Sequence, residues 1–190
     1  MVQEAAGCVR ALLEELGLAG FPKTTGNRGL HVYLRLQTRW DPVTVRSAAV
    51  AVARELERRH PALITAAWWK EERGERIFVD FNQNAPHKTV FAPWSVRARE
   101  MAPVSCPISW DELGAVLPDD LTIAVVPERV RRLGDPWATM DDRPASLEPL
   151  LEFVARDQAA GLTDAPWPPV YPKMEGEPTR VAPSRARKKD

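Results

Sequence analysis

The segment KTTGNRGLHVYLRL, residues 23–36, joins a glycine-containing turn to a strict alternation of apolar and polar side chains. An alternation of period two is typical of a strand that buries one face. The apolar face of this predicted strand carries Leu30, Val32, Leu34 and Leu36. The opposite face carries His31, Tyr33 and Arg35. The segment therefore predicts a turn that leads into a half-buried strand with a polar outer face.

The turn itself, TTGNRG, leaves two interpretations open. Its hydroxyls, its glycine-freed backbone amides and Arg28 are the components of an anion-binding loop. A glycine turn with a nearby lysine such as Lys23 is also a common way to begin a strand, with no ligand involved. The spacing matches neither a Walker A loop nor the dinucleotide-binding pattern GxGxxG. The residue types alone thus allow either a plain turn or a phosphate-binding loop.

Composition excludes several classes of protein. The 190 residues include 26 basic and 26 acidic ones, so the net charge does not point to nucleic acid or to a membrane surface. The length fits one domain. No apolar run approaches the ~20 residues of a membrane span, and the N-terminus lacks the pattern of a signal peptide. Cys8 and Cys106 are isolated, which indicates reduced thiols in a cytoplasmic protein.

Helical and extended patterns are mixed along the chain. Helices are expected over residues 2–16, over residues 42–59 with Asp41 as N-cap, at a Ser-x-x-Glu capping box opened by Ser109, and from SLEPLL with Ser146 as N-cap. Strands are also expected at RIFVDFNQN (76–84) and LTIAVV (121–126), whereas LITAAWW (63–69) fits either state.

These patterns predict an α+β fold, in which a mixed or antiparallel sheet is flanked by helices and open on one side. Residues 1–163 are expected to form the domain. Residues 164–190 are expected to form a proline-rich, basic C-terminal tail, because apolar periodicity ends there.

Asp80 is unusual because it lies at the centre of the apolar run IFVDF, where strand propensity disfavours an acid. If the two alternating strands share one sheet, His31 and Asp80 would converge on its polar face. A carboxylate beside a histidine and arginines suits a divalent metal with a phosphate ligand. Taken singly, a histidine such as His31 is more often a polar surface residue than a catalyst.

Four blocks of sequence, in this order, resemble one family. They are KTTGNRGLHVYLRL, HPALITAAWWKEERGERIFVDFNQN, PWSVRAREMAPVSCPISWDEL and GDPWATMDDRPASLEPLL. They are similar to the polymerase domain of bacterial ligase D and of its stand-alone actinobacterial relatives, within the archaeo-eukaryotic primase superfamily. The resemblance extends over almost the whole chain, and it implies the C-terminal portion of a primase-like catalytic domain.

The resemblance implies a DNA repair enzyme that adds nucleotides to a 3′-hydroxyl by two-metal catalysis with Mn²⁺ or Mg²⁺, in non-homologous end joining or gap filling. The implied partners are DNA ends or a primer-template, nucleoside triphosphates, Ku and an ATP-dependent DNA ligase, in the nucleoid region of the cytoplasm. The implied catalytic residues are His31, Arg97 and Asp80, the last also a metal ligand. The implied nucleotide-binding residues are Lys23, Thr25, Gly26, Arg28, Gly29, His31 and Arg97.

The loop departs from the family's usual Lys-Thr-Ser-Gly-Gly at two positions. Thr25 replaces the serine and keeps its hydroxyl. Asn27 replaces the second glycine, and asparagine tolerates left-handed backbone geometry better than most residues.

The family's paired aspartates, Asp-x-Asp, occur nowhere in the 190 residues. Glu55 and Glu57 lie on a predicted helix, where residues two apart point in nearly opposite directions, and Glu175 and Glu177 lie in the tail. We therefore expect nucleotide or DNA affinity with little or no polymerase activity from this chain alone. Three hypotheses follow: part of a polymerase whose N-terminal strand is not in this chain, a non-catalytic nucleotide- or DNA-binding module, or a separate polypeptide that supplies the missing half.

Overall fold

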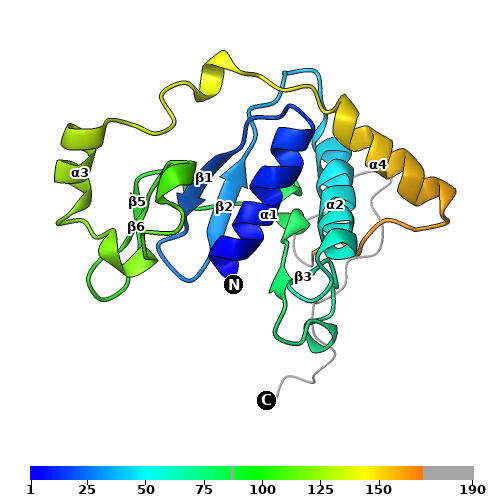
Figure 1. Ribbon diagram of the computed structural model, residues 1–190, viewed down its shortest axis with the longest axis horizontal. Coiled ribbons are helices and arrows are strands. Elements are labelled where there is room, and N and C mark those ends of the chain that lie inside the picture. Colours follow the sequence, from blue (N-terminus) through cyan, green and yellow to red (C-terminus); the bar gives the residue numbers. More distant parts are fainter. Residues whose placement is uncertain (87, 169–190) are drawn as a thin grey trace. The chain divides into compact units, whose positions relative to one another are not determined.

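The computed structural model describes residues 1–86 and 88–168 (Figure 1). Its α-helices are α1 (Val2–Glu15), α2 (Pro42–Arg59), α3 (Val126–Leu133) and α4 (Glu148–Ala159). Its strands form three two-stranded sheets, β1–β2, β3–β4 and β5–β6. The predicted α+β class is confirmed. The chain divides into two compact units, and each is described by itself: the first comprises Met1–Gln37 and Val90–Ser146, the second Thr38–Thr89 and the chain from Leu147.

The first unit is built on an antiparallel hairpin. β1 (Phe21–Thr24) pairs with β2 (Leu30–Tyr33), in a register that sets Lys23 opposite His31. The chain after β6 (Val104–Ser105) runs along the other edge of β1, where the Thr24 amide donates to the Cys106 carbonyl at 2.9 Å. β6 in turn pairs with β5 (Ser95–Val96). Residues close to β5 are thereby brought next to the loop between β1 and β2.

α1 covers one side of this hairpin, alongside β2 (Figure 1). Its apolar residues recur at helical spacing, and Leu12 and Leu13 are buried as that pattern predicts. Gly20 makes the close approach possible, because a Cβ there would lie 2.8 Å from Leu13 Cδ1 and 3.1 Å from Val32 Cγ1. The predicted first helix is confirmed, as is the capping box at Ser109, which opens the 3₁₀ turn η3 (Trp110–Glu112).

The strand predicted from the opening segment is shorter than its alternation suggests. β2 ends at Tyr33, and the chain then forms only an isolated bridge between Leu36 and Ala145. The face predicted to be polar is partly covered, because the Trp137 ring lies 5.0 Å from the Tyr33 ring and 6.5 Å from the Phe21 ring. The alternation of apolar and polar residues does not predict this aromatic packing, which covers the Tyr33 end of the face.

Two further predictions, for residues 121–126 and for Ser146 at the end of the first unit, are wrong. Residues 121–126 are not a strand: Thr122 makes one isolated bridge to Pro103, and the chain then turns into α3, whose first turn contains Pro127. Proline suits the start of a helix because the amide it lacks would have no partner there. Ser146 is not the N-cap of α4, since the helix begins one residue later than expected, after Leu147.

The second unit packs α2 against α4, side by side in Figure 1. The bounds predicted for α2 are confirmed, with Asp41 Oδ1 accepting from the Val43 and Thr44 amides at 2.9 and 3.0 Å. The ambiguous segment 63–69 contributes β3 (Ile64–Thr65), which pairs in parallel with β4 (Ile77–Phe78). The core of this unit comprises Val50, Ala53, Trp68, Phe81 and Ala165.

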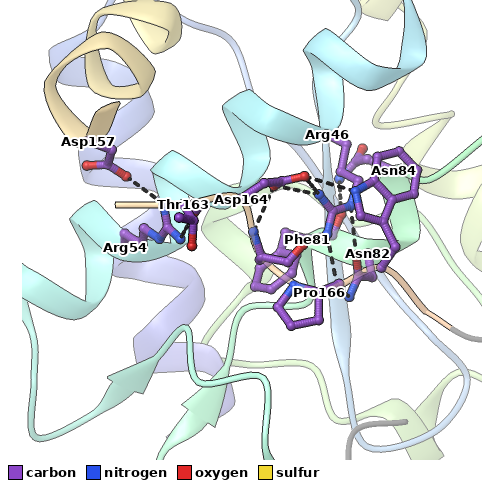
Figure 2. A network of polar contacts seen from close by, with 11 residues as sticks. Arg46, Arg54, Phe81, Asn82, Asn84, Asp157, Thr163, Asp164 and Pro166 are labelled. Atoms are coloured by element: carbon purple, nitrogen blue, oxygen red, sulfur yellow. Dashed lines mark hydrogen bonds and ion pairs between the residues drawn. The ribbon is translucent and has the colours of Figure 1, made fainter. Parts of the chain in front are cut away.

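The second unit contains a fully buried arginine, Arg46, whose polar contacts are shown in Figure 2. Arg46 Nε donates to Asn82 Oδ1 at 2.9 Å, and Nη1 donates to Asp164 Oδ1 at 2.8 Å. Its guanidinium also stacks 4.3 Å from the Trp167 ring, whose residue is 1% exposed. The predicted tail therefore begins within a packed segment, because residues 164–167 are held against α2. The remainder of that tail, from residue 169, lies outside the described residues.

Candidate functional site

The loop between β1 and β2 is closed by the Thr25 side chain. Thr25 Oγ1 donates to the Gly29 carbonyl at 3.1 Å and accepts from the Asn27 and Gly29 amides, both at 3.3 Å. The Thr25 amide donates to the same Gly29 carbonyl at 3.1 Å. The hydroxyl predicted to contact phosphate therefore holds the loop in shape.

The two glycines of this loop have different roles. Gly26 has φ +65°, and a Cβ there would lie 2.5 Å from Arg97 Cγ and 3.2 Å from the Val104 carbonyl carbon. A left-handed backbone and the lack of space both require glycine at this position. Gly29 has no left-handed φ, and a Cβ there would lie 3.5 Å from Thr25 Cγ2, an ordinary contact. Gly26 is thus the residue that lets Arg97 pack onto the loop.

Lys23 lies in β1, just before the loop, and its side chain is fully buried. Its ammonium donates to Ser105 Oγ and to the Thr24 carbonyl, the latter at 3.4 Å, and lies 5.9 Å from the centre of the Tyr33 ring. Burial is the main cause that lowers the pKa of Lys23 from 10.5 to about 8, and the positive charge of Arg97 lowers it further. Two cations are therefore held close enough to repel one another.

His31 shares a sheet face with Lys23, because the two are direct partners in the antiparallel register. The His31 ring lies 6.2 Å from the Tyr33 ring in a tilted arrangement. The structure therefore brings together Lys23, His31 and the loop that carries Gly26, whereas their binding of phosphate stays a prediction.

Arginines border the exposed side of the loop. The Arg97 guanidinium lies 3.4 Å above the centre of the Phe91 ring, and Arg99 Nη1 donates to Asn27 Oδ1 at 2.6 Å. Arg28, within the loop, is exposed. Such a group of guanidiniums suits charge-assisted hydrogen bonds to the oxygens of a polyanion.

Sequence reasoning missed three residues of this site: Ser105, Arg99 and Phe91. Arg99 had a local signal, because the Arg-x-Arg spacing of SVRAR repeats the charge of Arg97 two residues later. Ser105 had none, since its contact with Lys23 depends on a strand pairing between segments far apart in the chain.

Asp80 has a local role in the second unit. β4 ends at Phe78, and Asp80 instead caps the 3₁₀ turn η2 (Phe81–Asn84). Its Oδ1 accepts from the Asn82 amide at 3.1 Å, and its Oδ2 accepts from Gln83 Nε2 at 2.8 Å. The prediction of a strand through this residue is wrong, and capping explains an acid in an apolar run. Its convergence with His31 stays a prediction.

The described residues do not fit a divalent metal centre. Within residues 1–86 and 88–168 there is no group of three or more His, Cys, Asp or Glu side chains that could hold an ion. Both Asp80 oxygens accept hydrogen bonds from nearby residues. Glu55 and Glu57 lie on α2 as predicted, where Glu55 binds arginines and Glu57 Oε1 accepts from Thr65 and Arg76. No catalytic step can be assigned to a metal from these residues.

Residues 1–137 match the family described as LigD, primase-polymerase domain. The chain belongs to this family, and the resemblance found in the sequence is confirmed. Among the described helices, none has the length and apolar content required to cross a bilayer.

Curated relatives of the chain are considerably longer proteins. It is 37% identical over 172 residues to the multifunctional non-homologous end joining DNA repair protein LigD of Mycobacterium tuberculosis (strain H37Rv), covering 89% of this chain and 22% of that protein. It is 36% identical over 174 residues to the multifunctional non-homologous end joining protein LigD of Mycolicibacterium smegmatis, covering 90% of this chain and 22% of that protein. The chain thus spans about a fifth of the length of these relatives.

A solved structure is similar in fold as well as in sequence. The polymerase domain from Mycobacterium tuberculosis ligase D, in complex with DNA, matches with a TM-score of 0.69 and 38% identity. The match covers 75% of this chain and 50% of that one. The primase-like fold predicted from the resemblance is therefore confirmed.

Proposed function

We propose that this chain binds the triphosphate of a nucleoside triphosphate, as the nucleotide-binding part of a DNA repair nucleotidyltransferase of the ligase D type. The observation that carries the proposal is the packing of Arg97 onto Gly26, close enough to the buried Lys23 for its charge to lower the pKa of that ammonium in addition to the larger effect of burial. Burial first, and then the positive charge of Arg97, disfavour the charged form of Lys23 and lower its pKa, so the two cations repel one another in the absence of an anion. A triphosphate would relieve that repulsion.

The residues in and around the loop would each make a different contribution to binding. Arg97 and Arg28 would donate charge-assisted hydrogen bonds to phosphate oxygens, and His31 would donate from the strand face behind them. Lys23, which is buried and donates a hydrogen bond to Ser105 Oγ, would contribute its positive charge. Thr25 and Gly29 would keep the loop closed through their mutual hydrogen bonds.

Calorimetric titration with a nucleoside triphosphate tests this proposal. Arg97→Ala and His31→Ala should each weaken binding by roughly tenfold or more, since a hydrogen bond to a charged group contributes about 1.5–3 kcal/mol. Arg131→Ala is the matched control, because Arg131 is an exposed arginine on α3 that pairs with Glu128 in the same unit. Absence of binding, or equal binding by all four proteins, contradicts the proposal.

Catalysis requires more than the described residues provide. Transfer to a 3′-hydroxyl by two metals needs several acidic ligands, and no such group occurs in residues 1–86 and 88–168. We therefore expect this chain alone to bind nucleotide without extending a primer in the presence of Mn²⁺. Primer extension by the purified chain would refute that expectation.

This deficit favours a second candidate function, a non-catalytic nucleotide- or DNA-binding module. Co-expression with a polypeptide that carries an Asp-x-Asp strand separates the two candidates. Restored primer extension would support the polymerase, whereas binding without restored activity would support the module. DNA ends or a primer-template, Ku and an ATP-dependent ligase are the proposed partners, in the nucleoid region of the cytoplasm.

A further inference from the structure

Four arginines gather on α2 and α4 of the second unit: Arg54, Arg58, Arg59 and Arg156. They surround two acids, Glu55 and Asp157, and we refer to the four as the arginine cluster. None of them belongs to the loop between β1 and β2, so the cluster is a feature separate from the proposed nucleotide site.

One carboxylate holds three of these guanidiniums. Glu55 Oε1 accepts from Arg58 Nη2 at 2.6 Å and from Arg59 Nε at 2.5 Å. Its Oε2 accepts from Arg58 Nε at 3.0 Å and from Arg156 Nη1 at 2.7 Å. Hydrogen bonds from Arg58, followed by those from Arg59 and Arg156, hold the pKa of Glu55 down at about 2. The carboxylate therefore stays charged and fixes the arginines in place.

The second acid extends the cluster along α4. Asp157 accepts from Arg156 Nη2 at 3.3 Å. It also accepts from Arg54 Nη1 at 3.3 Å (Figure 2). Arg54 Nη2 also donates to the Thr163 carbonyl at 2.6 Å. Arg156 thus bridges both acids, which links the guanidiniums from the two helices into one network.

The acidic side chains of the cluster are much less exposed to solvent than its most exposed arginines. The Glu55 side chain is 0% exposed and that of Asp157 is 7% exposed, whereas those of Arg58 and Arg156 are 64% and 44% exposed. Four positive and two negative charges leave a net charge of +2 within the cluster. An ordinary surface ion pair exposes both partners, but here the acids lie underneath, Arg58 and Arg156 face water, and Arg54 and Arg59 are 26% and 29% exposed.

We propose that the arginine cluster is a docking surface for the phosphodiester backbone of DNA. Guanidinium forks match the geometry of phosphate oxygens, and arginines already held by a buried carboxylate lose less side-chain freedom on binding. Arg58 uses Nε and Nη2 on Glu55, which leaves Nη1 for a phosphate. The choice of DNA as the polyanion rests on the proposed function, although the cluster lies outside the nucleotide site.

Fluorescence anisotropy with a labelled DNA duplex, at salt concentrations between about 50 and 200 mM, tests this inference. Arg58→Ala and Arg156→Ala should each weaken binding several-fold at low salt. Each should also reduce the slope of log affinity against log salt by about 0.9, the value for one lost phosphate contact. Arg58→Lys keeps the charge and should keep the slope.

Arg39→Ala is the matched control in the same unit, because Arg39 pairs with Glu148 and both side chains are more than half exposed. Its slope should equal that of the unaltered protein. Both Arg58 variants leave Arg59 and Arg156 on Glu55, so the buried carboxylate keeps partners. Unchanged slopes in Arg58→Ala and Arg156→Ala, or an equal loss in Arg39→Ala, would overturn the inference.

Titration of the same variants with a nucleoside triphosphate separates this inference from the proposed function. Nucleotide affinity should be equal in the unaltered protein, Arg58→Ala and Arg156→Ala. If the unaltered protein binds no nucleotide but Arg58→Ala and Arg156→Ala show the reduced salt slope for DNA, the proposed function is refuted and the docking surface is supported. If the unaltered protein binds nucleotide but both variants keep its salt slope for DNA, the docking surface is refuted and the proposed function is supported.

Discussion

At the scale of single residues, the two glycines of the first loop give the sharpest test of the candidate site. Gly26→Ala forces a left-handed alanine against Arg97, which should cost about 1–3 kcal/mol of unfolding free energy and displace the guanidinium. Nucleotide affinity should fall with it. Denaturant unfolding and calorimetry measure the two effects.

Gly29→Ala is the built-in control, because its Cβ would make only ordinary contacts with Thr25. It should leave both stability and nucleotide affinity nearly unchanged. Equal behaviour of the two alanine variants would show that close packing of Arg97 on the loop is irrelevant to binding.

The lowered pKa of Lys23 leads us to expect that the stability of the protein changes with pH in the alkaline range. Its pKa is about 8 in the folded protein and 10.5 in the unfolded chain, so between these values the unfolded chain binds more protons. The free energy of unfolding should therefore gain a contribution as pH rises from about 8 toward 10.5. Urea unfolding at several pH values measures it, with Lys23→Met as the reference. A difference between the two proteins that stays constant with pH would contradict this account.

At the scale of elements, local signals decided which predictions succeeded. α2 has the predicted bounds because Asp41, Pro42 and the His60-Pro61 pair mark its ends within the segment itself. α3 was missed because its apolar start reads as a strand until the turn at Thr122 is known. The predicted strand through Asp80 failed since two residues of pairing, followed by a capped turn, leave the same alternation in sequence.

The packing of α2 on α4 gives an element-scale prediction. Glu55→Gln should lower the free energy of unfolding at neutral pH by about 1–3 kcal/mol, because hydrogen bonds to a charged group are lost. The pKa of Glu55 is about 2 when folded and 4.5 when unfolded, so this stability is present above pH 4.5 and is lost as pH falls toward 2. Unfolding curves of both proteins should converge in acid. A gap that persists at pH 2 would contradict the assignment.

At the scale of the whole molecule, the family and the α+β class were predictable because several sequence blocks and two alternating patterns act together. The arrangement of the site was only partly predictable. The contacts of Lys23 with Ser105 and of Gly26 with Arg97 join segments far apart in the chain, and no periodicity encodes them. The absence of Asp-x-Asp, by contrast, could be read directly from the sequence.

Arg46 carries a prediction for the second unit as a whole, because it joins α2, η2 and the segment after α4. Arg46→Met should reduce the free energy of unfolding by about 3–5 kcal/mol, since the buried partners lose their cation. Arg39→Met, which removes an exposed ion pair, should cost no more than about 1 kcal/mol. Denaturant unfolding followed by tryptophan fluorescence compares the two, and equal losses would contradict a special role for Arg46.

The same arginine sets a limit on how far the chain can be shortened. Truncation after Thr163 would remove the Asp164 carboxylate and the Trp167 ring, leaving a guanidinium with 0% exposure without its counter-ion. Truncation after Pro168 would keep the contacts of Arg46 with Asn82, Asp164 and Trp167. We expect the longer version to resist proteolysis like the full chain and the shorter one to be digested rapidly. The proline-rich stretch that looks dispensable in sequence therefore begins with four residues that the fold requires.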